Sequence, residues 1–323
     1  MKKYVLAMLL TGSVVLEGCA IGSAPSVEGV NLTDGASDEN VEQGNDTEAG
    51  DDAVSADDTA AEDSAVTDES VDGDYEQFTK DYTDDIKTKV TEITASSNSL
   101  TDELTSIVAL YDEYDSLTTN APDQTAMNEV CGWGTVVWKE ECLSLLGRME
   151  TSDPTGYQDV KSEYDNWEKY VPAMAQKMSD IYADGSIYPV IYSYNTAMRY
   201  KRYAYILASS LADIQGEVTF SFPDSTMCGY YGDYSSDSYL IITEGMESGS
   251  YDIVIHIDDT KEIRGWGSIE ENSDGSEVMA FTSDDAAVEG TIDCFALGAT
   301  FYVSASDGSI VSQEESYDFT FKY

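Results

Sequence analysis

The sequence predicts an α+β multidomain protein, in which a disordered acidic tether leads into an antiparallel helical bundle and then a small antiparallel β-barrel or β-sandwich. Three patterns predict it. An early segment is acidic and lacks basic residues, a middle segment repeats its apolar residues every three or four positions, and the last segment alternates with period two. With 323 residues there is room for two ordinary domains. We divide the chain into residues 1–19, 20–74, 75–214 and 217–323.

Residues 1–19 read as a lipoprotein signal peptide. Lys2 and Lys3 precede an apolar run from Tyr4 to Leu16, which is shorter than the roughly 20 residues of a membrane-spanning helix and fits a signal peptide. The following Leu-Glu-Gly-Cys resembles a bacterial lipobox, which implies that Cys19 becomes the lipidated N-terminus. The alternative is an ordinary secretory signal with a chance cysteine. We expect a lipid-anchored protein on the outer face of a bacterial cell membrane, that of a Gram-positive cell.

Residues 20–74 carry 17 acidic residues and no Lys or Arg. No periodic apolar pattern appears among them, so they cannot bury enough apolar surface to offset the entropy of ordering. We interpret this segment as a disordered linker that like charges extend. A calcium-binding tail is the alternative, but the acidic pairs lack the spacing of an EF-hand loop.

The charge excludes several partners. Acidic residues number 63 and basic residues 16, giving a net charge of −47. A nucleic-acid binder needs a basic face, so no nucleic acid is expected as a partner. Contact with a membrane is expected through the lipid anchor only. His256 is the single histidine, which excludes a zinc site built on paired histidines. We expect no metal and no cofactor.

The helical half should consist of four amphipathic helices joined by short turns, which is typical of an antiparallel bundle. The first, from Asp74 to Tyr114, is either one long helix or two collinear helices with a break and a new cap at Ser96–Ser99. The others are expected at about 123–150, 157–181 and 188–214. The apolar stripe of the third helix is Val160, Tyr164, Trp167, Val171, Met174, Met178 and Ile181. We interpret such stripes as core packing rather than a cofactor site.

After Gln215-Gly216 the alternation predicts seven or eight short strands at nearly regular spacing, which favours a meander closed as a barrel or sandwich. In pattern this half resembles small lipocalin-like (calycin) modules. The expected strands are Glu217–Phe222, Ser238–Thr243, Tyr251–Ile257, Arg264–Glu270, Val278–Thr282, Val288–Ile292, Thr300–Ser304 and Tyr317–Lys322.

Three stretches of the helical half carry a family resemblance. They are Asp123–Cys131, with a Gln-x-x-Met-Asn start, Tyr164–Tyr170, with a Trp-x-x-Tyr segment, and Gly185–Ile187 followed by Arg199–Leu207. In this order they resemble the LprI-like lysozyme-inhibitor family of secreted and lipid-anchored bacterial proteins, over about residues 100–212. The resemblance implies inhibition of lysozyme by binding. The chain departs from the family by lacking a cysteine at 171–178 and by carrying a strand domain.

The cysteines other than Cys19 form two possible pairs. Cys131 and Cys142 would lie about 16 Å apart along one helix, beyond the roughly 7 Å limit for a disulfide. They can bond only if Gly132 and Gly134 break the helix, and two buried thiols are the alternative. Cys228 and Cys294 both fall in the strand half, where a possible disulfide would stabilise by about 4 kcal/mol on the chain-entropy model.

The sequence has no Gly-x-Ser-x-Gly elbow, no His-Glu-x-x-His and no phosphate loop, and His256 shares a polar strand face with Asp252. Carboxylate pairs such as Glu140-Glu141 could serve a glycosidase, but such pairs arise by chance among 63 acids. We therefore expect a binding protein and no catalytic residues. The first hypothesis is an inhibitor or binder of host lysozyme or another basic protein, which an acidic partner attracts by steering. The candidate contact residues lie at two turns: Asp123, Gln124, Asp184 and Ser186. The alternative is an envelope or adhesion-type lipoprotein whose β module binds a glycan or a small apolar ligand in a barrel mouth.

Overall fold

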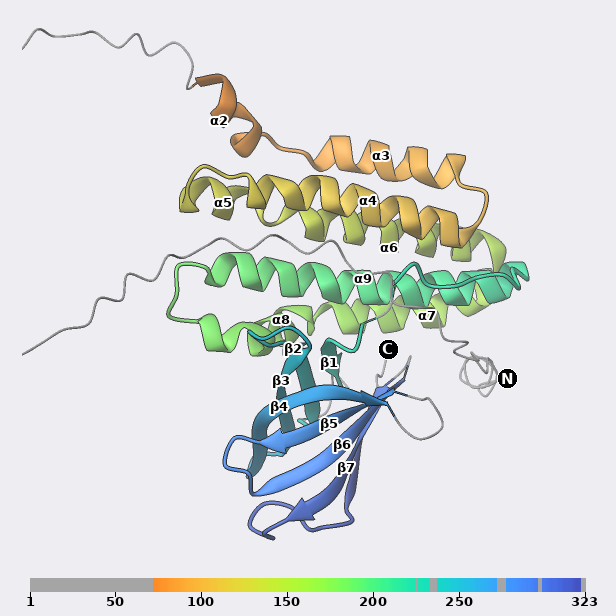
Figure 1. Cartoon of the computed structure of the whole chain (residues 1–323). Coiled ribbons are helices and arrows are strands. Elements are labelled where there is room, and N and C mark those ends of the chain that lie inside the picture. The colour runs from red at the N-terminus through yellow and green to blue at the C-terminus, as the bar shows by residue number, and fades with distance from the viewer. Residues whose placement is uncertain (1–71, 225, 233–236, 272–276, 296–297, 321–323) are drawn as a thin grey trace, which may run out of the picture. The chain divides into compact units, whose positions relative to one another are not determined.

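The structure is a computed structural model that describes residues 72–224, 226–232, 237–271, 277–295 and 298–320. The predicted signal peptide, Cys19 and the tether up to residue 71 lie outside the described residues. The described residues all belong to the unit Ser70–Tyr323. In this unit a set of helices is followed by an antiparallel, nearly closed, barrel-like sheet (Figure 1), which confirms the predicted fold class.

The long helices pack side by side (Figure 1). The helical elements are α2 (Asp72–Thr79), α3 (Thr83–Ser96), α4 (Leu100–Thr119), α5 (Gln124–Val130), α6 (Trp133–Ser152), α7 (Pro154–Glu168), α8 (Val171–Ser179), the 3₁₀ turn η1 (Asp180–Tyr182) and α9 (Tyr188–Gln215). Helix α6 is central, because α3, α4 and α9 all pack against it.

The break expected at Ser96–Ser99 is confirmed. Ser97 has extended backbone dihedrals, and the Ser99 side chain caps α4 by accepting a hydrogen bond from the Asp102 N–H at 3.0 Å. The expectation of collinear helices is wrong, since α3 and α4 form an antiparallel hairpin (Figure 1). Folding back lets both helices place their apolar stripes on α6.

Two of the expected long helices are each divided. The second breaks after Val130, with Cys131 as the C-cap of α5 and Gly132 before α6. The third breaks after Glu168, and α8 begins with Pro172 in its first turn. Pro172 has no N–H to bond a carbonyl of the preceding turn, so α7 cannot continue through it.

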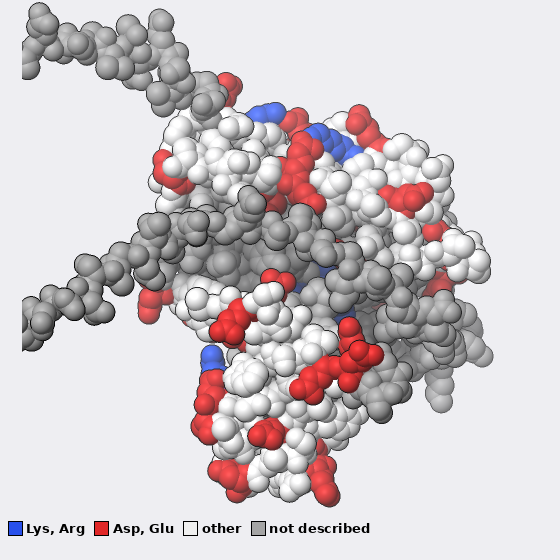
Figure 2. Space-filling model, in the orientation of Figure 1, with Lys and Arg blue, Asp and Glu red and all other residues white. Residues whose placement is uncertain are grey.

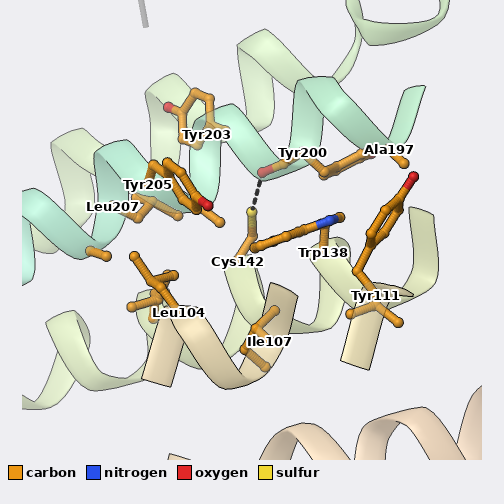
Figure 3. Close-up of a cluster of buried hydrophobic side chains, with 14 of the residues drawn as sticks. Leu104, Ile107, Tyr111, Trp138, Cys142, Ala197, Tyr200, Tyr203, Tyr205 and Leu207 are labelled. Carbon is orange, nitrogen blue, oxygen red and sulfur yellow. Dashed lines mark hydrogen bonds between the residues drawn. The ribbon is translucent and has the colours of Figure 1, made fainter. Parts of the chain in front are cut away.

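The helical core is built from the predicted aromatic and aliphatic stripes. Trp138 and Cys142 of α6 lie between Leu104 and Ile107 of α4 and the tyrosines of α9 (Figure 3). All four of these side chains have no exposed surface. Trp138 meets Tyr205 edge-to-face at 5.8 Å between ring centroids, a favoured aromatic geometry.

The sheet is an antiparallel meander in the order β1-β2-β3-β4-β5-β6-β7-β8. Its strands are β1 (Gly229–Tyr231), β2 (Tyr239–Glu244), β3 (Ser250–Asp258), β4 (Lys261–Glu271), β5 (Glu277–Ser283), β6 (Val288–Phe295), β7 (Gly298–Ser306) and β8 (Ser316–Thr320). Inward residues fill the barrel, with Phe281, Phe301 and Phe319 at most 2% exposed. A bulge at Glu289/Gly290 helps to bend β6. A side chain at Gly290 would lie 2.3 Å from the Tyr302 carbonyl oxygen.

The strand expected at Glu217–Phe222 is wrong, and β1 takes the first place in the sheet instead. The alternating side chains of this segment anchor it to the helices. The Glu217 carboxylate accepts from the Leu100 N–H at 3.2 Å, and Phe222 stacks on Tyr205 at 5.3 Å. The helical core cluster also includes Tyr230, Tyr239 and Ile241 of the first two strands, so helices and sheet share apolar contacts.

Among the described helices, none is both long and apolar enough to cross a membrane.

Candidate binding surface

The connection between α8 and α9 is an exposed turn with its own backbone hydrogen bonds. Every residue from Asp180 to Ile187 is exposed. The run begins with the 3₁₀ turn η1, and two further backbone hydrogen bonds follow: the Gly185 N–H donates to the Tyr182 carbonyl at 2.9 Å, and the Tyr188 N–H donates to the Gly185 carbonyl at 3.1 Å. We call residues 180–187 the α8–α9 turn. Its backbone bonds preorganise it without covering its side chains.

A buried polar contact holds the base of this turn. The Asn195 side-chain amide of α9 donates to the Ser179 hydroxyl at the end of α8, at 3.0 Å, and this hydroxyl in turn donates to the Ala175 carbonyl at 2.8 Å. Ser179 and Asn195 are 0% and 4% exposed. Since buried polar groups are costly when unpaired, these bonds fix α8 against α9 and keep the turn in one place.

The α8–α9 turn displays apolar and acidic side chains together. Ile181, Tyr182 and Ile187 are 62%, 41% and 36% exposed, and Asp180 and Asp184 are exposed beside them. Apolar anchors with a polar rim are the composition of protein-binding surfaces. Other exposed apolar residues, such as Val218 and Met246, occur singly along the chain.

Two of the four predicted contact residues, Asp184 and Ser186, lie on this turn and are exposed. The apolar part was missed, because Ile181 was expected in the core stripe of the third helix. That expectation is wrong: α8 ends at Ser179, and the tighter 3₁₀ turn brings Ile181 round to solvent. The signal that could have revealed it is the Asp-Gly-Ser sequence, which ends the helical period only a few residues later.

The other two predicted residues, Asp123 and Gln124, have structural partners. One Asp123 carboxylate oxygen accepts from the Ala126 N–H at 2.9 Å as the cap of α5, and the other accepts from the Tyr75 hydroxyl. The Tyr75 bond and then the backbone bond lower the pKa of this carboxyl. The Gln124 amide donates to the Asn128 side chain at 2.8 Å. Neither residue needs a partner protein to satisfy its polar atoms.

The two predicted turns nevertheless lie at the same end of the helical part (Figure 1). The Cys131 thiol at the end of α5 contacts the Pro189 carbonyl and the Ser193 hydroxyl at the start of α9, at 3.7 and 3.3 Å. The structure therefore places α5 beside the first turn of α9, next to the α8–α9 turn.

Acidic groups dominate the surface around these elements. Acidic patches are scattered over the face in Figure 2, and basic atoms are few. Several lysines are already paired with carboxylates, which leaves the remaining acids uncompensated. These pairs are Lys80–Asp85, Lys89–Glu113, Lys139–Glu168, Lys161–Asp165 and Lys201–Asp224. A field of this sign raises the encounter rate with a cationic protein.

A buried charged cluster occupies the interior of the helical part. Arg148 of α6 donates to both carboxylate oxygens of Glu103 of α4, at 2.8 and 2.6 Å. The Glu141 carboxyl, fully buried, lies 3.9 Å from the same guanidinium. Burial first, and then the charge of Glu103, raise the pKa of Glu141 well above its usual value. Because both carboxyls are buried, we interpret this cluster as part of the core and not as a binding site.

His256 lies on the half-buried polar face of β3. Its Nδ1 atom is 3.0 Å from the Glu262 carboxylate, and its ring stacks on Tyr239 at 4.5 Å. The ammonium of Lys177, a residue of α8, lies 3.9 Å from the Tyr239 ring centroid. In the described ranges no group of three or more His, Cys, Asp or Glu residues is placed to hold a metal ion.

All four described cysteines are free thiols. The helix does break between Cys131 and Cys142, but their side chains point to different parts of α9: Cys131 to Ser193 and Cys142 to the Tyr200 carbonyl, at 3.3 and 3.5 Å. Of the alternatives left open by the sequence, the structure holds this pair as separate thiols.

Comparisons with protein-family models, with curated proteins and with solved structures find no match to this chain. The resemblance to the LprI-like lysozyme-inhibitor family therefore stays a prediction.

Proposed function

We propose that this chain is a lipid-anchored binding protein on the outer face of a bacterial membrane, and that it captures a basic protein through the α8–α9 turn. The observation that carries the proposal is the run from Asp180 to Ile187, which combines exposed apolar anchors with acidic neighbours on a fixed base. The family resemblance makes lysozyme the first partner to test.

The apolar and acidic residues of the turn have different roles in this proposal. Fully burying an Ile side chain that was exposed contributes roughly 1.5–3 kcal/mol, so Ile181, Tyr182 and Ile187 supply the affinity. An exposed ion pair contributes only about 0–1 kcal/mol, so Asp180 and Asp184 chiefly speed and orient the encounter.

The predicted anchor and linker fit the same proposal. Two acyl chains on Cys19 would hold the protein firmly at the membrane. Residues 20–74, all acidic or neutral, would extend from it and give the binding surface reach. A lysozyme that approaches the cell wall would then meet a tethered, negatively charged binding protein.

Binding kinetics with purified lysozyme test these roles separately. Replacing Ile181, Tyr182 and Ile187 by Ser should raise the dissociation rate at least tenfold, while Val218→Ser with Met246→Ser, equally apolar and more exposed, should leave it unchanged. Asp180→Asn with Asp184→Asn should lower the association rate and its salt dependence. The matched control is Asp284→Asn with Asp293→Asn, two exposed acids in the β5–β6 turn and on β6. Equal effects of test and control variants would contradict the proposal.

A glycan-binding β module is the second candidate, favoured by two exposed aromatic residues. Trp266 of β4 and Tyr302 of β7 are 52% and 48% exposed on the outer face of the sheet. Their cross-strand neighbours are all polar, Thr282 and Asp252 beside Trp266 and Thr291 and Ser316 beside Tyr302, as suits a surface that contacts a sugar. Since phenylalanines fill the barrel interior, we place such a ligand on this outer face. Quenching of tryptophan fluorescence by cell-wall polysaccharide, lost in Trp266→Ala and insensitive to salt, would support it.

A further inference from the structure

Two cysteines far apart in the sequence lie at one end of the barrel. Cys228 directly precedes β1, and Cys294 is near the end of β6. Both are partly buried and pack against the same hydrophobic cluster, which fills the barrel. On β6, Cys294 follows the inward positions Gly290 and Ile292, so its side chain belongs to the interior face.

One tyrosine hydroxyl connects the two positions. Tyr231 of β1 donates a hydrogen bond from its hydroxyl to the Met227 carbonyl, at 2.6 Å, and Met227 is the residue before Cys228. The same hydroxyl forms a hydrogen bond with the Cys294 side chain. The Tyr231 hydroxyl therefore joins the backbone beside Cys228 to the Cys294 side chain.

We propose that Cys228 and Cys294 are a dithiol that forms an intramolecular disulfide by exchange with an external disulfide. One thiolate attacks the external disulfide, forms a mixed disulfide and displaces the first thiol. The other cysteine then attacks the sulfur of the first cysteine in this mixed disulfide and displaces the second external thiol. The protein loses two S–H protons and two electrons, and the external disulfide gains both as it leaves as two thiols.

The bond would act at an edge of the sheet. In the sheet order β1 is an edge strand of three residues, hydrogen-bonded only to β2, and β6 is five places away. A disulfide between the residue before β1 and the end of β6 would tie the edge to the far side of the barrel. It would thus hold the nearly closed sheet in its curved form, with no change in strand register. This inference is independent of the proposed partner.

The surroundings predict slow exchange that speeds up with pH. Burial raises the pKa of Cys294 to about 11 and also raises the pKa of Cys228. Nearby guanidinium groups oppose this effect, Arg199 for Cys228 and Arg202 for Cys294. Because the thiolate is the attacking species, the rate should rise through the alkaline range.

Oxidised glutathione is the probe for the purified full-length chain. Peptide mapping without reduction should show one cross-linked pair that contains Cys228 and Cys294, and the oxidised chain should unfold at a higher urea concentration by its strand signal. Cys228→Ser and Cys294→Ser should each abolish both results. Cys142→Ser, a change at the buried thiol of the helical core, should keep the cross-link.

Three outcomes would overturn the inference. In the first, Cys228 and Cys294 of wild type each stay bound to a glutathione and no cross-link forms between them. In the second, either cysteine bonds to a different cysteine. In the third, the cross-link forms but the urea midpoint does not move. The mapping is done on wild type, so it does not depend on the folding of any variant.

Discussion

Arg148 should be among the most sensitive charged residues of the helical part. The Arg148→Met change keeps most of the apolar stem but removes both hydrogen bonds to Glu103, at 2.8 and 2.6 Å. The Glu103 side chain is only 3% exposed and Glu141 is 0% exposed. The variant therefore leaves two buried carboxyl groups without a cation.

The expected cost follows from these burials. Breaking a buried pair by removing one partner typically costs 3–5 kcal/mol. The Arg148 side chain is 28% exposed, so water can reach the vacated position, and we expect a loss of about 3 kcal/mol. Urea unfolding at neutral pH, followed by the helical circular dichroism signal, measures it.

Lys161→Met is the matched control. Lys161 pairs with Asp165 on one helix face at 2.5 Å, and their side chains are 34% and 48% exposed. Such exposed pairs contribute about 0–1 kcal/mol. A loss below about 1 kcal/mol in Arg148→Met, or one equal to that of the control, would refute the assignment of Glu103 as a buried carboxylate that depends on Arg148.

Three further predictions concern pH, backbone space and anchoring. The raised pKa of Glu141 means that its contribution to stability is fully present below the unfolded-state pKa of about 4.3 and is lost as pH rises through the folded-state value. The stability of Glu141→Gln relative to wild type should therefore improve as pH rises above about 4.3, and a difference that does not change with pH would contradict the raised pKa. Gly290→Ala should destabilise the barrel by about 2 kcal/mol or more, since the new methyl would lie 2.3 Å from the Tyr302 carbonyl oxygen. The control Gly147→Ala has open space in helix α6 and should stabilise the protein by about 0.5–1 kcal/mol. Urea titrations measure both changes. Cys19→Ala should release the protein from the membrane fraction, and retention equal to wild type would rule out the lipid anchor.

The repeating patterns of the sequence predicted most of the elements, and the exceptions have physical causes. Seven expected strands from Ser238 onward have counterparts in the sheet. Alternation of apolar and polar residues indicates a strand with one buried face. At Glu217–Phe222 the same alternation belongs to an extended segment that contacts the helices. Periodicity alone cannot distinguish such a segment from a strand of the sheet. Strand β1 has three residues, all buried, so it shows no alternation.

The candidate site was predicted in part. Turn chemistry located Asp184 and Ser186, because Asp, Gly and Ser end helices. The exposure of Ile181 depends on where α8 stops, and a continuing 3.6-residue period hides that point. The Glu103–Arg148 pair joins residues 45 positions apart, and only the packing of α4 on α6 brings them together. The sequence has 63 acids, so no single one could be selected as its partner.

We propose that the α8–α9 turn binds and inhibits a basic enzyme, and lysozyme turnover tests this proposal most directly. Cell-wall hydrolysis by lysozyme is measured at physiological salt with increasing amounts of the full-length chain, of its Ile181→Ser, Tyr182→Ser, Ile187→Ser variant, and of an unrelated protein of equal negative charge. We expect saturable inhibition by wild type, at least tenfold weaker inhibition by the variant, and none by the charge control. Equal inhibition by all three, or inhibition by none, would contradict it.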